Sequence, residues 1–530
     1  MTLSHIKYLL TVATFAAVLV GRPANAADFS NIRQASSLET SLRRICAEAN
    51  PAVMPYLLPS SLSDISLGGR WNHDGDTRPV EEGTGELSGR VMASSYNRLS
   101  PAITVWGHAR FTAAKIRDVK WTNATDNSLV GPYVFGDAVG GDLVSRSYDF
   151  SGGYAGSAGA WTWGAQGAYR AQLDYRNRDP RDKIVVSDLN LALGGTRRLG
   201  RLPLAIGVAT RLRIYHQTTD LQFYNPLNDI YTFALTGLGT IYPRFSGDDE
   251  IALAYNGTGF GADLTLSSTA VAAQQYAARI SAGHIRIRQF LRAYNNLELT
   301  HTSTDSLIIQ LSALTTAGCA RFGATLRGTL FRKTGTENIF GTSSGNTYPV
   351  LGSRDNYRHT STLLQLSLPG SFTLGKSDRL ISAIGGDWEH NSQKVTSPHR
   401  EITVNRFSLS TSHSWWHTLS QKTALEVKAE AAHCFVNPQT ILLGNGSTDE
   451  TGTEATAAEP GNAMEALHAA TLHNAAVATS DVTLLLLGAG FRVALSQGGV
   501  LNIHADWRHS LFNRQLGDAD RISLCIGVTL

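Results

Sequence analysis

The sequence predicts an all-β fold, a transmembrane antiparallel β-barrel of about eighteen strands, with about 14–16 strands as the alternative. Three observations support this prediction: an N-terminal export signal, long segments in which apolar and polar residues alternate, and connections that are short and long in turn. Strict alternation indicates β-strands, because successive side chains of a strand point to opposite faces. Alternating short turns and long loops are typical of bacterial outer-membrane barrels.

Residues 1–26 are predicted to be a cleaved signal peptide. They contain the basic Lys7, an apolar stretch from Tyr8 to Val20 and the small-residue site Ala24-Asn25-Ala26. The apolar stretch is shorter than the roughly 20 residues that a membrane-spanning helix needs. An uncleaved anchor is the alternative. Cleavage near Ala26 predicts export toward the cell outer membrane.

Residues 27–60 precede the first predicted strand and differ in pattern from the rest. Ser36 and Glu39 have the spacing of a helix capping box, and Pro51 is expected to end the helix. Between them, apolar residues follow at helical spacing: Leu38, Leu42 and Ile45. We expect this segment either to lie in the periplasm or to plug the lumen. It is too short for the folded plug domain of TonB-dependent receptors.

The barrel is predicted to occupy residues 61–530. Residues 161–176, WTWGAQGAYRAQLDYR, show the alternation most clearly, with apolar residues at odd positions and mostly polar residues at even positions. We expect strands near 61–72, 84–96, 102–121, 143–156, 160–176, 184–198, 202–216, 250–267, 273–292, 304–317, 319–332, 357–368, 379–392, 402–417, 422–435, 481–495, 499–511 and 521–530.

A membrane explains why both faces of these strands differ. An unpaired backbone group costs several kcal/mol in hydrocarbon, and a closed barrel pairs every such group. One face then meets lipid and the other a wet lumen. The alternative is a large secreted β-sandwich or propeller, but strand length, the loop pattern and the final strand favour a membrane barrel. Tryptophans are expected to form interfacial girdles: Trp71, Trp106, Trp121, Trp161, Trp163, Trp388, Trp415, Trp416 and Trp507.

Five stretches carry a family resemblance: YRNRDPRDKIVVSDL (175–189), LTGLGTIYPRFSG (235–247), YNGTGFGADL (255–264), YNNL (294–297) and GTENIFG (335–341). They resemble an uncharacterised outer-membrane β-barrel family of the Bacteroidota, a domain of unknown function. The resemblance implies an integral barrel in a Gram-negative envelope and no established activity. In addition, NPAVM at 50–54 is similar to the Asn-Pro-Ala found near the mature N-terminus of long-chain fatty-acid transporters.

Charged residues on the polar faces of the predicted strands are the candidate functional residues. Arginine in a lumen favours the passage of anions, because guanidinium binds phosphate and carboxylate well. The alternative is that these arginines pair with acidic residues and hold the wall together, and a one-residue shift in register would reverse the faces. The pore-lining candidates are Arg110, Arg170, Asp174, Arg176, Arg211, Arg213, Arg286, Arg288 and Arg327.

The sequence therefore predicts a pore or transporter for a small polar or anionic solute. A surface accessory barrel with a closed lumen, supporting a partner system, is the alternative. Neither a zinc-protease nor a serine-hydrolase motif occurs, so we expect no catalytic residues, and no metal or cofactor site is predicted. The 46 Lys and Arg nearly balance the 43 Asp and Glu, which argues against a nucleic-acid partner. Expected partners are outer-membrane lipids and lipopolysaccharide, with an unknown solute or envelope protein.

Overall fold

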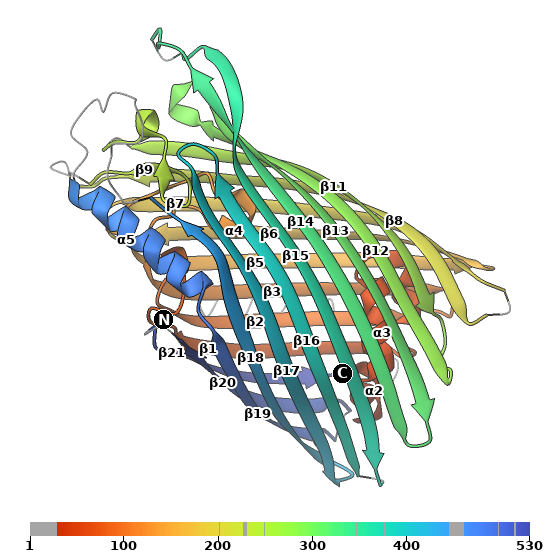
Figure 1. Ribbon diagram of the computed structural model, residues 1–530. Helices are drawn as coiled ribbons and strands as arrows, with labels where there is room; N and C mark the ends of the chain where they lie inside the picture. Colours follow the sequence, from red (N-terminus) through yellow and green to blue (C-terminus); the bar gives the residue numbers. More distant parts are fainter. Residues whose placement is uncertain are drawn as a thin grey trace.

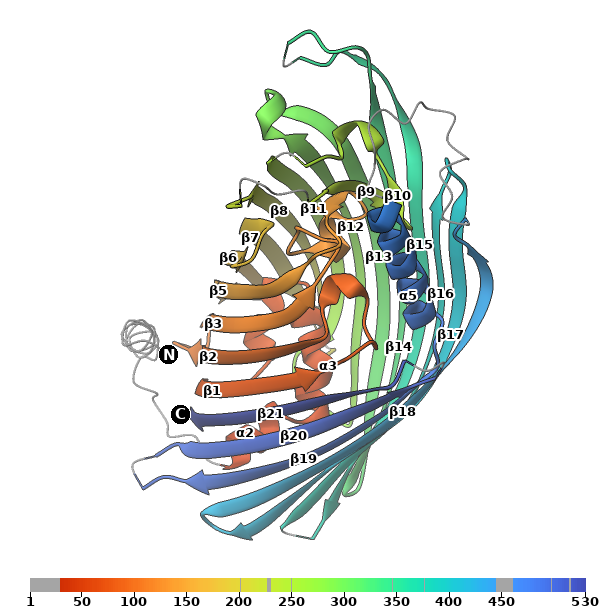
Figure 2. The same cartoon turned by 90° about the vertical axis from the view of Figure 1, so that its left-hand side faces the viewer.

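A closed antiparallel sheet of 18 strands forms the wall of the protein in a computed structural model (Figure 1 and Figure 2). The structure describes residues 29–200, 202–225, 230–248, 250–345, 347–375, 377–444, 461–496, 498–513 and 516–530. The sheet closes because its first strand pairs with both the second and the last. The predicted signal peptide lies outside the described residues. Of the described helices, none has the length and apolar character to span a membrane.

Each of the predicted strands corresponds to one strand of this wall, so the predicted fold class is confirmed. The wall strands are β1 Leu62–His73, β2 Gly85–Arg98, β3 Ile103–Val119, β5 Gly141–Ala158, β6 Trp161–Arg176, β7 Arg181–Arg198, β8 Leu204–Gln222, β11 Ile251–Ser268, β12 Gln274–Leu291, β13 Leu297–Ala317, β14 Ala320–Phe340, β15 Val350–Leu374, β16 Asp378–Val395, β17 Arg400–Ser420, β18 Thr423–Leu442, β19 Val482–Ala494, β20 Val500–Phe512 and β21 Asp518–Thr529. Strands β13 to β15 extend well beyond their predicted ends.

The two ends of the barrel have connections of different length. At one end the strands are joined by short turns, such as residues 159–160, 318–319 and 421–422. At the other end lie the long connections 120–140 and 223–250, together with the segment between β18 and β19. Short turns face the periplasm in bacterial outer-membrane barrels, so these ends are called periplasmic and extracellular here.

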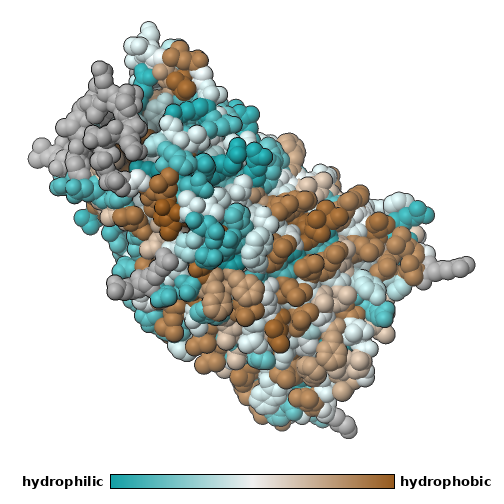
Figure 3. All heavy atoms as spheres, viewed as in Figure 1, coloured by the Kyte–Doolittle hydropathy of each residue, from teal (hydrophilic) through white to brown (hydrophobic). Residues whose placement is uncertain are grey.

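The outer face of the wall is apolar toward the periplasmic end. In β6 the side chains of Trp161 and Trp163 are 56% and 53% exposed, while Thr162 and Asp174 on the alternate positions are buried. Figure 3 shows hydrophobic residues gathered over the half of the barrel away from the long connections. A closed barrel with such a band fits a bilayer. The protein is therefore an integral barrel of the outer membrane, as predicted.

Three short helices occupy the lumen at the periplasmic end: α2 (Phe29–Ala35), α3 (Leu38–Ala47) and the 3-10 helix η1 (Pro51–Tyr56). In both ribbon views α2 and α3 lie between opposite walls of the barrel (Figure 1 and Figure 2). Helix α3 packs against β11, β12 and β13, and η1 packs against β5, β6 and β7. Residues 29–58 are called the N-terminal segment below.

The predicted capping box is wrong by one residue. Ser37, not Ser36, caps α3, and its hydroxyl accepts a hydrogen bond from the Thr40 backbone N–H. The Ser36 hydroxyl instead donates to backbone carbonyls at the end of α2. Helix α3 ends at Ala47, before Pro51, which opens η1. The box failed because Ser36 lies in the turn directly after α2, a helix that the sequence pattern did not reveal.

The extracellular mouth is covered by a folded cap that the sequence did not predict. The extracellular cap consists of residues 74–84, 120–140, 230–248 and 461–480. Its elements are η2 Val80–Glu82, α4 Asn127–Val130, β4 Val134–Gly136, β9 Phe233–Gly237, β10 Thr240–Ile241, η3 Pro243–Phe245 and α5 Gly461–Ala478, with η4 Arg292–Tyr294 between β12 and β13 nearby. Strands β4, β9 and β10 form a separate small sheet. Apolar cap residues, including Phe135 and Val134, pack with inward residues of the wall in one buried cluster.

Candidate functional site

The N-terminal segment contacts the wall through Asn50. The Asn50 amide nitrogen donates to the carbonyl oxygens of Gly195 and Val208 at 3.3 and 3.2 Å. Its side-chain oxygen accepts from the Ala52 backbone N–H at 2.9 Å, which caps η1. Asn50 is fully buried. Hydrogen bonds to both its amide nitrogen and its amide oxygen fix the position of the side chain. The Asn-Pro-Ala stretch is therefore the attachment point of the segment.

Glycines of three adjacent strands make room for this attachment. A Cβ atom on Gly164 of β6 would lie 2.5 Å from the Pro51 carbonyl carbon. A Cβ atom on Gly207 of β8 would lie 2.6 Å from the Asn50 amide nitrogen, and one on Gly194 of β7 would also collide with Asn50. Only glycine permits such a close approach of two backbones. These three glycines form a seat for the N-terminal segment.

The rest of the segment is held by buried polar contacts. The Cys46 thiol donates to the Leu266 carbonyl at 3.2 Å, and burial raises the pKa of this thiol to about 11. Glu39 forms an ion pair with Arg321 of β14 at 2.6 Å. The Tyr96 hydroxyl donates to the Met54 carbonyl at 2.8 Å. The segment thus makes specific contacts on opposite sides of the lumen.

Most of the predicted lumen arginines face inward and are paired with aspartates. Arg213 binds Asp188 at 2.7 Å, and Arg211 binds Asp263 at 2.7 Å. Arg110 binds Asp149 at 3.3 Å. Arg170 binds Asp126, a residue of the extracellular cap, and lies 3.6 Å from Asp188. The charges of this wall are therefore largely compensated, as the alternative hypothesis expected.

A cavity of about 200 Å³ lies at this part of the wall, lined among others by Asn190, Arg211 and Arg213. Arg327 also shares the inward face of β14, because its neighbour Leu326 is exposed on the outer face. Its guanidinium Nε is buried and has no hydrogen-bond partner in the described part of the chain. Together, the cavity and Arg327 show that the lumen between the N-terminal segment and the extracellular cap is polar.

The predicted site residues Asp174 and Arg176 lie where β6 meets the extracellular cap. Arg176 contacts Asp137 of the cap at 2.9 Å and Asp182 of β7 at 3.1 Å, and all three side chains are at most 1% exposed. Asp174 accepts a hydrogen bond from the Thr125 hydroxyl of the cap at 2.5 Å. These two residues therefore hold the cap to the wall, and they are too buried to line an open channel.

The placement of Arg286 and Arg288 in the lumen is wrong. Both are exposed on the outer face of β12, where Arg288 lies 3.9 Å from Glu298 of β13. The intervening Ile287 is 3% exposed and packs inward with the apolar cluster of the cap. At this height the lumen is filled by apolar cap residues and the outer face stands above the lipid. In this part of β12 the polar face therefore points outward and the apolar face points into the lumen, the reverse of the arrangement within the membrane.

Four further arginines on the inner wall were not among the predicted candidates. Arg70, Arg90, Arg508 and Arg521 lie on β1, β2, β20 and β21, the strands that close the barrel. The signal was present in the sequence: Ile522, Leu524 and Ile526 share the outer face, which puts Arg521 on the inner one. Arg508 alternates in the same way with Trp507.

Residues 74–84 and helix α5 are joined within the cap by a hydrogen-bonded pair. The Asn474 side chain donates to both carboxylate oxygens of Glu81, at 2.9 and 3.0 Å, and accepts from the Val80 backbone N–H. The His473 ring lies 2.9 Å from the Arg78 carbonyl. Burial raises the pKa of the Glu81 carboxyl, and the hydrogen bonds from Asn474 oppose that shift.

We expect Asn474→Ala to loosen the cap by about 1–2 kcal/mol, because it leaves a largely desolvated carboxylate without its donors. Hydrogen exchange of α5 and η2 should accelerate in the variant. Glu465→Ala, at an exposed position on the same helix, is the matched control and should not change the exchange rates. Equal rates in both variants would show that this contact does not hold the cap.

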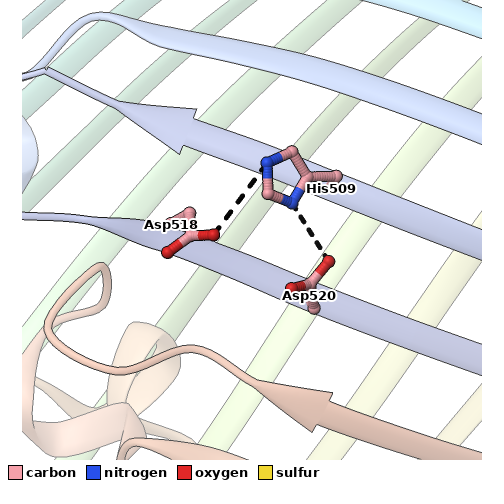
Figure 4. Close-up of side chains that lie close together, drawn as sticks. All are labelled: His509, Asp518 and Asp520. Carbon is pink, nitrogen blue, oxygen red and sulfur yellow. Dashed lines mark hydrogen bonds and ion pairs between the residues drawn. The ribbon is translucent and has the colours of Figure 1, made fainter.

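One group of possible metal ligands lies on the outer face, not in the lumen. His509 of β20 lies 3.0 Å from Asp520 and 4.0 Å from Asp518 of β21 (Figure 4). Their donor atoms lie within 4.8 Å of one another. The Trp507 ring nitrogen also donates to Asp520. The polar groups of these residues bind one another beside the outward-facing Trp507. The group therefore belongs to the outer surface of the barrel and does not line the lumen.

Solved structures with similar barrels give low scores. The outer membrane transporter YddB from Escherichia coli has a TM-score of 0.38 and 9% identity, covering 88% of this chain and 80% of that chain. The siderophore receptor PiuA from Acinetobacter baumannii gives 0.38 and 6%, over 88% and 81%. The unliganded ferric citrate transporter FecA gives 0.37 and 9%, over 88% and 78%. Similarity at this level supports no conclusion about the function of this chain.

No curated protein matches the sequence. A family model does, and it covers the wall, the cap and the Asn-Pro-Ala attachment point from Pro51 onward. Over residues 51–530 the chain matches the family described as Family of unknown function (DUF6850), and it belongs to that family.

Proposed function

We propose that this protein is a gated transporter for a small polar or anionic solute. The observation that carries the proposal is a charged lumen filled at both ends by segments of the same chain. An eighteen-strand barrel is wide enough to leave an aqueous channel. The N-terminal segment then acts as a periplasmic plug and the extracellular cap as an outer gate. The predicted division into signal peptide (1–26), plug segment (27–60) and barrel (61–530) is part of this proposal.

A surface accessory role with a permanently closed lumen is the second candidate. It is favoured by the ion pairs that neutralise Arg110, Arg211 and Arg213, since paired arginines exert a weaker field on a passing anion. In this case the cap would present a surface to a partner envelope protein. The two candidates differ in whether the wild-type barrel ever conducts ions.

Single-channel recordings of the refolded protein in planar bilayers test the proposal. We expect rare openings of constant conductance, with reversal potentials under asymmetric salt that show anion preference. Arg211→Gln/Arg213→Gln should shift the preference toward cations, because Asp263 and Asp188 lose their partners. Arg286→Gln/Arg288→Gln, with the same charge change on the outer face, is the control. An inserted wild type that never opens would favour the accessory role.

The proposal also includes the setting of the protein. Residues 175–189 and 335–341, whose sequences carry the resemblance, support an origin in the Bacteroidota. Outer-membrane lipids and lipopolysaccharide, which surround the apolar band of the wall, are its proposed partners there. No catalytic role is assigned to any residue.

A further inference from the structure

Four arginines lie on four adjacent strands where the barrel closes. Arg508 of β20 is directly opposite Arg521 of β21. Arg521 is opposite Asn72 of β1, two residues from Arg70 on the same inner face. Arg90 of β2 is opposite Gly68, and its Nε would lie 3.0 Å from a Cβ atom on that glycine. We call Arg70, Arg90, Arg508 and Arg521 the seam arginines.

In the described part of the chain the seam arginines, like Arg327 on β14, have no partners, in contrast to the paired arginines of the lumen. Among the residues that the structure describes, none of the four has a carboxylate within ion-pair distance or donates a side-chain hydrogen bond, and the Nε of Arg521 is buried without a partner. By contrast, Arg176, Arg211 and Arg213 each bind an aspartate within about 3 Å, the ordinary range of a charge-assisted hydrogen bond. Arg176, Arg211 and Arg213 thus have a carboxylate beside them, whereas the seam arginines have none within ion-pair distance among the described residues.

The arrangement is repulsive as it stands. Like charges directly opposite one another in a sheet are destabilising. The positive charges of Arg70, Arg78 and Arg508 act on the Arg521 guanidinium, and Asp74 acts on it in the opposite sense. However, Asp74 is already bound by Arg78 at 3.2 Å.

Three other carboxylates share this inner wall. Asp64 of β1 accepts a hydrogen bond from the Thr529 hydroxyl at 3.0 Å. Asp506 lies 2.8 Å from the His504 ring nitrogen and so has a partner of its own. Glu86 is opposite Asn72, with no arginine within ion-pair distance among the described residues. Four guanidinium groups against these three carboxylates, none of which lies within ion-pair distance of a seam arginine, leave an excess of positive charge, which an anion from outside would neutralise.

We propose that the seam arginines bind an oxyanion that carries at least two negative charges, of the phosphate or dicarboxylate class. Guanidinium groups form paired N–H···O bonds with such oxyanions, and four of them share this inner face on adjacent strands. The site lies at the level of the outward Trp71 and Trp507, below residues 74–84 of the cap. A ligand that has passed the extracellular cap would meet this site before it reaches the N-terminal segment. Its role as a solute site rests on the proposed transport function, whereas binding itself does not.

Calorimetric titration of the folded protein in a nonionic detergent with inorganic phosphate, and separately with succinate, tests the site. We expect wild type to bind one of the two probes, which identifies the class of oxyanion. Arg508→Gln/Arg521→Gln should weaken that binding by about tenfold or more. Arg286→Gln/Arg288→Gln makes the same change in net charge on the outer face and should leave the affinity unchanged.

Urea unfolding gives a second, independent readout. Without added anion, Arg521→Gln should be as stable as wild type or more stable, since it removes repulsion. Added phosphate or succinate should stabilise wild type and not the variant. Folded wild type that binds neither probe, or equal weakening in the outer-face control, overturns the proposal. A barrel that binds phosphate but never conducts would refute transport and leave this site standing.

Discussion

Gly164→Val is expected to drive the N-terminal segment from its seat and to make the rare openings of the barrel longer and more frequent. A Cβ atom at this position would lie 2.5 Å from the Pro51 carbonyl carbon and 2.7 Å from the Ala52 nitrogen. These are backbone atoms, which cannot rotate away from the added methyl groups. Strand β6 cannot yield easily, because it pairs with β5 and β7 along nearly its whole length. The segment is therefore the element that moves.

Two measurements should report this movement together. In planar bilayers, Gly164→Val should show long openings with the conductance of the rare wild-type events. Cys46 gives the second readout, because its thiol is fully buried and burial raises its pKa to about 11. In a background where Cys319, Cys434 and Cys525 are replaced by serine, a maleimide should label Cys46 slowly in wild type and rapidly in the variant.

Gly167→Val is the matched control on the same strand. Gly167 lies on the outer face, and the nearest atom to its Cβ position is a Leu191 methyl carbon at 3.6 Å. This variant should conduct and be labelled like wild type. Rapid labelling of Cys46 in Gly164→Val without any conductance would show that the cap alone closes the lumen. Unchanged labelling would show that the glycine seat does not position the segment.

The wall could be predicted from the sequence because lipid and lumen impose the same constraint on every strand. In β6, Trp161 and Trp163 face lipid while Thr162 and Asp174 are buried inside, as the alternation in residues 161–176 indicated. That constraint is local and repeats with period two, so the alternation can be recognised in one strand without knowing which strands lie beside it. The cap has no such repeat. Its sheet joins Val134–Gly136 to Phe233–Gly237, about which the local pattern contains no information.

The lumen residues could be predicted only in part, for a physical reason that Arg286 and Arg288 illustrate. Alternation shows that two faces differ, but the side on which the polar face lies depends on what fills the barrel. In the middle of β8, Arg211 and Arg213 meet inward aspartates. Higher up, Ile287 faces an apolar cap and its charged neighbours face water. Pairing partners such as Asp188 and Asp263 come from other strands, so charge compensation also could not be inferred from one segment.

Removal of the Arg176 guanidinium is expected to have the largest effect on stability. Arg176 is the shared cation of Asp137 and Asp182, and its second nitrogen donates to the Thr122 carbonyl at 2.8 Å. In Arg176→Met, two carboxylates would stay buried without a cation. Breaking a buried pair by removing one partner costs about 3–5 kcal/mol. We expect a loss of this size in equilibrium urea unfolding in detergent micelles, together with rapid proteolysis within residues 120–140.

Arg110→Met is the control with the same chemical change. The Arg110 and Asp149 side chains are 42% and 21% exposed to the lumen, so water screens their interaction. Its loss should cost less than about 1 kcal/mol. Equal losses in the two variants would mean that burial of Arg176 does not decide its contribution.

A triple variant separates the charge network from the packing. In Arg176→Met/Asp137→Leu/Asp182→Leu no buried charge remains, and an apolar replacement of a buried ion network is often neutral or stabilising. We therefore expect most of the stability lost in Arg176→Met to return. If it does, the cost arises from two stranded carboxylates, and the triad serves to fix the cap on the wall in one position. If the triple variant is as unstable as Arg176→Met, the hydrogen bond to Thr122 and the packing of the arginine side chain hold the cap instead.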